Sequence, residues 1–467
     1  MLCPRLIVIS AATAIMLAAG QAHAQSADEL RPTIWDAEDE IAGGETAAST
    51  AESGTEPVPP PGADIRQTLL EVSPAEPLPP LPRRRIAEDD AYAPLGWRIG
   101  NMTAFFALET GANFTDNVQQ SNTGRKSDIG LLLAPKFNIE SDWSRHKFTA
   151  QGNGQFVRYR DESDYDTEEA EARAELRLEV LRTTAIDLAG FYILTQDTAS
   201  AIDVPDDAIG TRNESFYGAS IALEQITGDF TTRLKTGVSR EYYGDVTLPN
   251  NTVDSNTDQN YYELGFSWRT TYAPTPNLRP FVELAYLPRH RDKKEDRNGL
   301  SRSSDGYAAT LGVGFDPSPI WSGEFGLIYM LRDYDDPALD PLATFGPIGR
   351  VTWRPTALTD LTLSAATYLD EATDPNSSGT RNWAADLDLV HALRENLKLL
   401  AGVGVTYQDT QGIDVTDVTL DANLGLTWQI TRWLAWKADY DFTWFNSNLE
   451  NSDYTENQVS VGLEIRN

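Results

Sequence analysis

Cysteine and histidine are nearly absent from this 467-residue sequence, which contains one cysteine, Cys3, and four histidines. These counts exclude a zinc site built from cysteine and histidine, and they nearly exclude a cysteine nucleophile. Beyond the N-terminus no apolar run reaches about 18 residues, which excludes a bundle of membrane-spanning helices. His146 and His391 are expected near short turns, the wrong end for a surface hydrolase, and His290 begins a long connection with no serine-centred motif nearby. We therefore expect no enzyme.

Basic residues are also scarce. The sequence has 38 lysines and arginines against 70 aspartates and glutamates, for a net charge of −32. The phosphates of nucleic acid would repel such a chain, so we expect no nucleic-acid partner. Asp333, Asp335 and Asp336 could hold calcium, but no glycine-punctuated calcium loop surrounds them. We expect no metal and no cofactor, and interpret the acidic segments as hydrated loops.

The first 24 residues have the pattern of a signal peptide. Arg5 precedes the apolar stretch 6–20, and Ala22-His23-Ala24 supplies the small residues that signal peptidase recognises. Cleavage is expected before Gln25. A retained membrane anchor is the alternative, which the shortness of the apolar stretch disfavours.

Residues 25–97 differ in composition from both neighbouring parts. They include Pro59-Pro60-Pro61 and the low-complexity stretch GGETAASTAESGTE at 43–56. Such a segment cannot bury enough apolar surface to offset the entropy of ordering. We expect a disordered, proline-rich periplasmic tail, which is either a spacer or a docking segment for a periplasmic partner.

From residue 98 onward, apolar and polar residues alternate. In 169–180 (EAEARAELRLEV) the composition favours a helix, but only a strand places all six apolar residues on one face. About eighteen such segments occur, with sixteen as an alternative count. Pro135 and Pro280 weaken two of them. The segments start near residues 103, 128, 146, 168, 185, 215, 230, 259, 278, 306, 321, 347, 360, 382, 397, 416, 433 and 457.

The connections between these segments alternate strictly between short and long, as in a bacterial transmembrane barrel with periplasmic turns and outer loops. The prediction for 98–467 is an all-β, antiparallel up-and-down barrel with both ends in the periplasm. A water-soluble sandwich would not require this alternation. Aromatic residues near strand ends suit the two membrane interfaces; they are Tyr242, Tyr243, Trp268, Tyr272, Trp321, Trp353, Trp433 and Trp444.

Several short motifs, weak singly but ordered along the chain, carry a family resemblance. They include Thr115-Asp116-Asn117-Val118, the stretches 140–146, 298–307 and 332–336, and Thr352-Trp353-Arg354-Pro355-Thr356. In these motifs the chain resembles the outer-membrane porin family labelled beta-barrel porin 2. The resemblance implies a Gram-negative outer-membrane barrel, inserted by the barrel insertion machinery and surrounded by lipid and lipopolysaccharide. Such barrels are found near exopolysaccharide and envelope genes, and the family label asserts no substrate.

Charged residues on the faces opposite the apolar stripes are the candidates to line a pore. A barrel of this size is wide enough for a water-filled lumen. We expect a channel or export-associated pore for hydrophilic solutes or envelope polysaccharide, with a modest cation preference. The alternatives are that inward charges only pair across strands, or that the barrel is a non-conducting scaffold binding through its acidic loops and tail. The candidates are Lys136, Glu140, Glu171, Arg173, Glu175, Arg177, Arg233, Lys235, Glu263, Arg269, Glu283, Asp421, Asp439 and Asp441.

Overall fold

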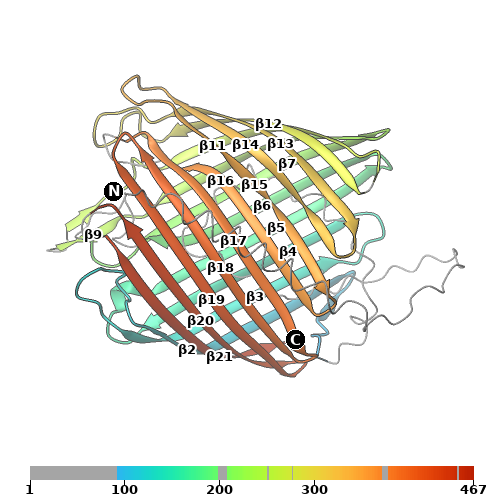
Figure 1. Cartoon of the computed structure of the whole chain (residues 1–467), viewed down its shortest axis with the longest axis horizontal. Helices are drawn as coiled ribbons and strands as arrows, with labels where there is room; N and C mark the ends of the chain where they lie inside the picture. The colour runs from blue at the N-terminus through green and yellow to red at the C-terminus, as the bar shows by residue number, and fades with distance from the viewer. Residues whose placement is uncertain (1–91, 198–207, 250–251, 276, 371–376, 450–451) are drawn as a thin grey trace, which may run out of the picture. The chain divides into compact units, whose positions relative to one another are not determined.

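The computed structural model describes residues 92–197, 208–249, 252–275, 277–370, 377–449 and 452–467, which form a closed all-β barrel (Figure 1). The expected signal peptide and most of the expected tail lie outside the described residues. Eighteen long antiparallel strands make the barrel wall. They are β2 (Met102–Thr115), β3 (Asp128–Ser141), β4 (Lys147–Tyr159), β5 (Thr167–Leu181), β6 (Thr184–Asp197), β7 (Arg212–Thr227), β8 (Phe230–Tyr243), β11 (Tyr261–Tyr272), β12 (Leu278–Arg291), β13 (Ser304–Ser318), β14 (Trp321–Tyr334), β15 (Leu342–Thr356), β16 (Thr359–Asp370), β17 (Gly379–Arg394), β18 (Leu397–Gln411), β19 (Val415–Thr431), β20 (Leu434–Ser447) and β21 (Tyr454–Arg466).

Each wall strand pairs with the next along the chain, and the last pairs with the first. The closing seam runs between β21 and β2, from Ala107 opposite Arg466 to Thr115 opposite Gln458. Asn467 extends the seam, because its side-chain Oδ1 accepts a hydrogen bond of 2.7 Å from the backbone N–H of Phe106. Closure leaves no free sheet edge, as a bilayer-spanning sheet requires.

Three short strands and a short helix complete the described structure. Strand β1 (Trp97–Ile99) adds to the barrel by pairing with β2, so the end of the expected tail is already held by the wall. Strands β9 (Val246–Leu248) and β10 (Thr252–Asp254) form a separate hairpin within the connection from β8 to β11. The helix is a single 3-10 turn, η3 (Ser163–Tyr165). No helix among the described residues is long and apolar enough to cross a membrane.

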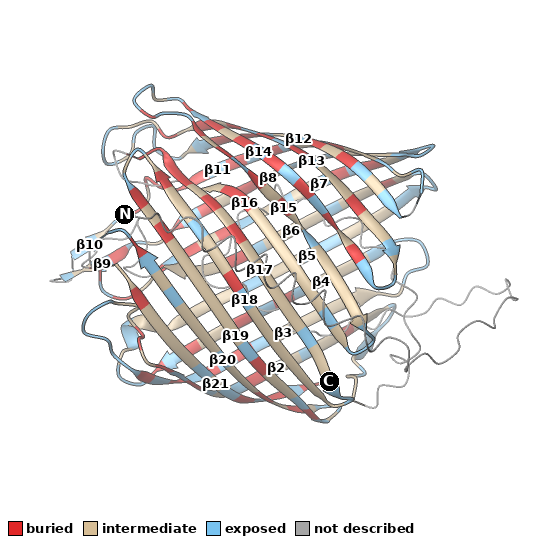
Figure 2. Ribbon diagram, viewed as in Figure 1, coloured by how far each residue is buried: buried red, intermediate tan, exposed pale blue. Residues whose placement is uncertain are grey.

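Buried and exposed residues alternate along parts of the wall strands (Figure 2), which separates the two faces of the wall. On β3, for example, Ile129, Leu131 and Leu133 are exposed on the outside, while Leu132 and Ala134, which alternate with them, are buried inside the barrel. Exposed apolar side chains on the outside and buried polar ones on the inside recur around the barrel. This is the inverse of a water-soluble fold, and it suits a wall that faces lipid.

Every predicted strand is present, and each begins within a few residues of its predicted start. Pro135 and Pro280 both lie inside strands after all. Proline has no N–H to donate to a neighbouring strand, and each of these two prolines is left out of the pairing with one of its neighbours. Pairing of β3 with β4 skips Ala134 and Pro135, and pairing of β12 with β11 reaches Phe281 but does not include the preceding Pro280.

The connections divide the barrel into two ends. Short connections such as 182–183, 228–229 and 395–396 lie at what we call the turn end, and long ones lie at the loop end. The alternation is not strict, however. The connection 412–414 at the loop end is a tight turn, made possible by the positive φ of Gly412.

The prediction for the aromatic residues was wrong at one position. Tyr242, Trp268, Trp321 and Trp433 are exposed on the outside, as are Tyr272 and Trp444, and Trp353 stacks on Trp321. Tyr243 instead points inward, is only 4% exposed, and donates a 2.6 Å hydrogen bond to Glu241. It follows Tyr242 directly, and neighbouring residues of a strand point to opposite faces.

Candidate functional site: the lumen of the barrel

All fourteen predicted residues lie on the inward face of the wall. Each occupies the parity opposite to the exposed apolar residues of its own strand, as Arg233 and Lys235 do beside the exposed Leu234. They come from β3, β5, β8, β11, β12, β19 and β20. Alternation therefore identified the correct face for every one of them. Their role in lining a pore remains a prediction.

Salt bridges connect the inward charges of β5 to β8. Arg177 lies 3.2 Å from Asp187 and 2.5 Å from Glu224. Arg233 lies 2.5 Å from Asp187 and 3.5 Å from Glu224. Two arginines thus share two carboxylates across four neighbouring strands, which largely cancels their charges.

A second set of pairs continues around the barrel on β11 to β14. Arg269 lies 2.6 Å from Glu324 and 3.4 Å from Glu283, with its guanidinium over the ring of Phe281. Glu263 binds two arginines, Arg289 at 2.8 Å and Arg332 at 2.9 Å. We call the inward surface of β5 to β14, including the Arg173–Glu175 pair at 2.7 Å, the paired wall. Lys235 lines a recess in it together with Arg173 and Arg279.

The inward surface of β17 to β20 is different. Asp386, Asp421, Asp439 and Asp441 have no lysine or arginine nitrogen within 4.0 Å among the described residues. Asp421 does accept a 2.8 Å hydrogen bond from the hydroxyl of Thr443. We call these four aspartates the carboxylate wall.

Glycines make room for the carboxylate wall. A Cβ atom on Gly404 would lie 2.6 Å from Oδ1 of Asp386, and one on Gly425 would lie 2.6 Å from Oδ1 of Asp439. Gly404 is paired with both Asp386 and Asp421, which places those two aspartates on either side of it. The carboxylates therefore lean over a part of the sheet that has no side chains of its own.

The strand order places the two walls opposite each other. In the ring of eighteen strands, β7 and β8 are separated from β17 to β19 by almost equal numbers of strands in both directions. The bore thus has an ion-paired side and an uncompensated acidic side.

A third cluster joins the strands next to the seam. Lys437 of β20 lies 2.6 Å from Glu109 of β2 and 3.9 Å from Glu464 of β21. Lys136 of β3 is 4.0 Å from the same Glu109. Glu140, also of β3, accepts a 3.2 Å hydrogen bond from Asn138. Lysines and glutamates alternate here, so this surface is also compensated.

Sequence reasoning missed about half of the charges in these clusters. Asp187, Glu224 and Asp386 each alternate with outward apolar residues, so the same parity rule could have found them. What the sequence could not supply is the pairing of residues on different strands. That pairing depends on the register between strands, for which side-chain alternation gives no signal.

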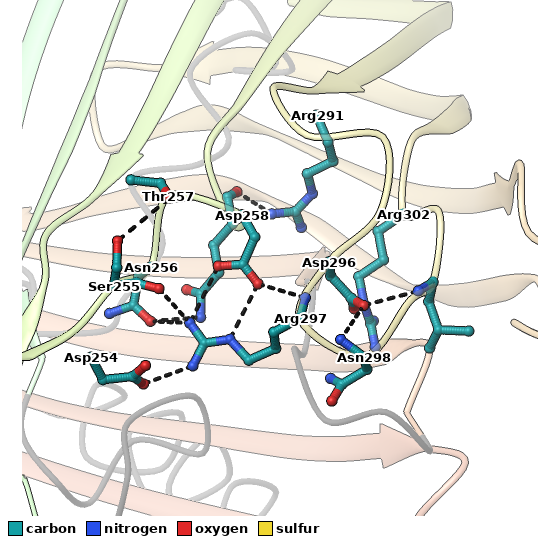
Figure 3. A network of polar contacts seen from close by, with 12 residues as sticks. Asp254, Ser255, Asn256, Thr257, Asp258, Arg291, Asp296, Arg297, Asn298 and Arg302 are labelled. Carbon is teal, nitrogen blue, oxygen red and sulfur yellow. Dashed lines mark hydrogen bonds and ion pairs between the residues drawn. The ribbon is translucent and has the colours of Figure 1, made fainter.

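The long loops hold a separate polar network (Figure 3). Arg297 binds Asp254 at 2.7 Å and Asp258 at 3.2 Å, and so ties the connection 292–303 to the connection 244–260. Burial alone would raise the pKa of Asp258, but hydrogen bonds from the side chain and backbone of Arg297 outweigh it and lower that pKa. The backbone N–H groups of Ser301 and Ala338 likewise lower the pKa of Asp336. These carboxylates are satisfied by arginine or backbone, and among the described residues no acidic, histidine or cysteine cluster is arranged to hold a metal.

Comparison with known proteins identifies a family. Residues 90–467 match the family model described as "Putative beta-barrel porin 2". No curated protein matches the chain significantly in sequence. Among solved structures, the chain is similar to the outer membrane protein opdK of Pseudomonas aeruginosa, with 10% identity and a TM-score of 0.41 over 78% of this chain and 98% of that one. It is similar also to OpdL of Pseudomonas aeruginosa, with 13% identity and a TM-score of 0.39 over 79% and 99%. At this level the similarity says nothing about which solute this chain would carry.

Proposed function

The chain belongs to the beta-barrel porin 2 family, and from that premise we propose that it is a passive outer-membrane channel for small hydrophilic solutes, with a preference for cations. The observation that carries the proposal is the contrast between the two walls. Arg177, Arg233 and Arg269 each lie within 2.6 Å of a neighbouring carboxylate, whereas Asp386, Asp421 and Asp441 have no lysine or arginine nitrogen within 4.0 Å among the described residues. The fixed charge left facing the lumen is therefore negative.

The proposal assigns the loop end to the cell exterior and the turn end to the periplasm. The barrel would reach this position by export through the signal peptide, with cleavage before Gln25, and by the barrel insertion machinery. Its exposed apolar belt, which includes Leu131, Leu234 and Leu311, would face lipid and lipopolysaccharide. The role of residues 25–97 stays open between a spacer and a docking segment for a periplasmic partner.

Conductance of the refolded, full-length protein in a planar bilayer tests this function. A channel gives discrete current steps that scale with salt concentration. A barrel that folds, as judged by its heat-modifiable mobility on a gel, and yet carries no current contradicts the proposal. That result would favour the scaffold alternative, in which the acidic loops or the tail bind a partner.

A further inference from the structure

The connection 116–127, between β2 and β3, begins with buried residues, although its second half, 122–127, is exposed. Asn117 in this connection is fully buried and Val118 is 7% exposed. Both belong to the motif Thr115-Asp116-Asn117-Val118, which the function proposed above does not use. Other residues of the barrel therefore cover Asn117 and Val118.

Val118 packs against the inner surface of the wall. Its neighbours in one buried cluster are Leu132 and Ala134 of β3 and Val157 and Tyr159 of β4. The first two alternate with outward leucines and Ile129, so they face the lumen. An apolar patch on the inside of a water-filled barrel would cost free energy if left bare, and burial of Val118 on it offsets that cost.

Polar contacts fix the turn that follows. The Nδ2 group of Asn117 donates to the carbonyls of Ser121 and Thr455, both at 3.0 Å. Gln120 is the single non-glycine residue with a positive φ, 50°, in the described parts of the chain. Such a conformation persists only where its surroundings impose it. Here Nε2 of Gln120 donates to Glu456 at 3.0 Å, and Glu456 also accepts a 2.6 Å bond from Thr115.

Glu456 connects this turn to the carboxylate wall. It is paired across the sheet with Thr443, which is paired in turn with Asp421 and donates to it. Asp421, Thr443 and Glu456 therefore form a row across three neighbouring strands, and this row ends at the side-chain amide of Gln120. The inward turn and the uncompensated acidic surface are parts of one continuous polar strip.

We propose that the turn 117–121 is the selective constriction of the channel, a narrowing beside the carboxylate wall that admits small cations and excludes larger solutes. This inference rests on the proposed channel function. Asn117 and Val118 are positioning residues that hold the turn against the wall, and Gln120 is the residue that meets the solute. The family motif then encodes the anchor of the constriction.

Thiol modification tests the constriction directly, because the sequence has a single cysteine, Cys3. We would introduce Gln120→Cys into the full-length chain with Cys3→Ser, and Asn122→Cys, at an exposed position of the same connection, as the matched control. Both would be treated with a cationic methanethiosulfonate reagent during bilayer recording. The current and the cation preference should fall after modification at position 120 and stay unchanged at position 122.

The outcomes separate the two proposals. If the unmodified protein carries no current, the channel function fails and the constriction fails with it. If current is present but modification at position 120 has no effect, or both positions respond equally, the constriction is wrong and the channel stands. Should Gln120→Cys not refold, Asn117→Ala tests the same inference. Releasing the turn should let larger uncharged saccharides enter proteoliposomes, and an unchanged size limit would overturn the inference.

Discussion

The Nζ atom of Lys437 lies 2.6 Å from Oε2 of Glu109, although the two residues are 328 positions apart in the sequence. Both side chains are less than a tenth exposed, at 7% and 6%. Their strands, β20 and β2, flank β21, so the ion pair spans the strand that closes the barrel. Closure of the sheet brings the ends of the chain together, and this pair joins their inner surfaces.

We expect Lys437→Met to destabilise the barrel strongly, because it leaves Glu109 buried without its closest cation. Breaking a buried pair from one side costs roughly 3–5 kcal/mol. Urea unfolding followed by tryptophan fluorescence in detergent would measure the loss. The double variant Glu109→Gln/Lys437→Met should recover much of it. Equal stability of the single variant and the wild type would show that lumen water replaces the lost partner.

Neutralising the carboxylate wall should reduce the cation preference. Asp386→Asn and Asp441→Asn each remove an uncompensated charge, and the two together should reduce it more than either alone. The double variant Arg173→Gln/Glu175→Gln is the matched control. It removes an ion pair whose atoms lie 2.7 Å apart and leaves the net charge of the lumen unchanged. Reversal potentials should therefore shift toward zero in the two aspartate variants and much less in the control. A larger shift from the control would contradict the assignment of the two walls.

The acidic outer loops can contribute to selectivity only through solvent. Charges at this end of the barrel are screened within about 8 Å at physiological salt, so neutralising Asp333, near the end of β14, together with Asp335 and Asp336 of the following connection should matter mainly at low salt. The same reversal-potential measurement at low and high salt checks this. A contribution that does not weaken as salt rises would place the selective field elsewhere than in the loops.

The loop network should survive mild acid. Binding by Arg297 and Arg240 lowers the pKa values of Asp258 and Asp292, and backbone hydrogen bonds lower that of Asp336. A lowered pKa in the folded state adds stability that is present above the unfolded value of about 3.9 and is lost as pH falls through the lowered folded value. Protection of the amides in the connections 244–260 and 292–303 against hydrogen exchange should stay high at about pH 5 and be lost only as pH falls below the unfolded value of about 3.9. Arg297→Ala should remove this protection throughout, and a network that opens already at about pH 6 would be inconsistent with these pKa values.

The sequence predicted the strands and the face of each residue well, and predicted contacts between strands poorly. The stretch 169–180 forms β5 despite its helical composition, because packing of one apolar face outweighs local propensity. Tyr243 was misassigned because aromatic residues suit both a membrane interface and a buried polar cluster. The inward turn at Asn117 could not be predicted, since its anchors on β3, β4 and β21 become neighbours only after the barrel closes.

The reversal potential of the refolded wild-type channel across a potassium chloride gradient tests the central claim most directly. A carboxylate wall opposite the paired wall predicts a reversal potential of the sign that marks cation preference. It also predicts that this potential declines as the salt concentration rises. A potential of the opposite sign would mean that Arg233, Lys235 and their neighbours set the field. That result would contradict the proposed contrast between the paired wall and the carboxylate wall.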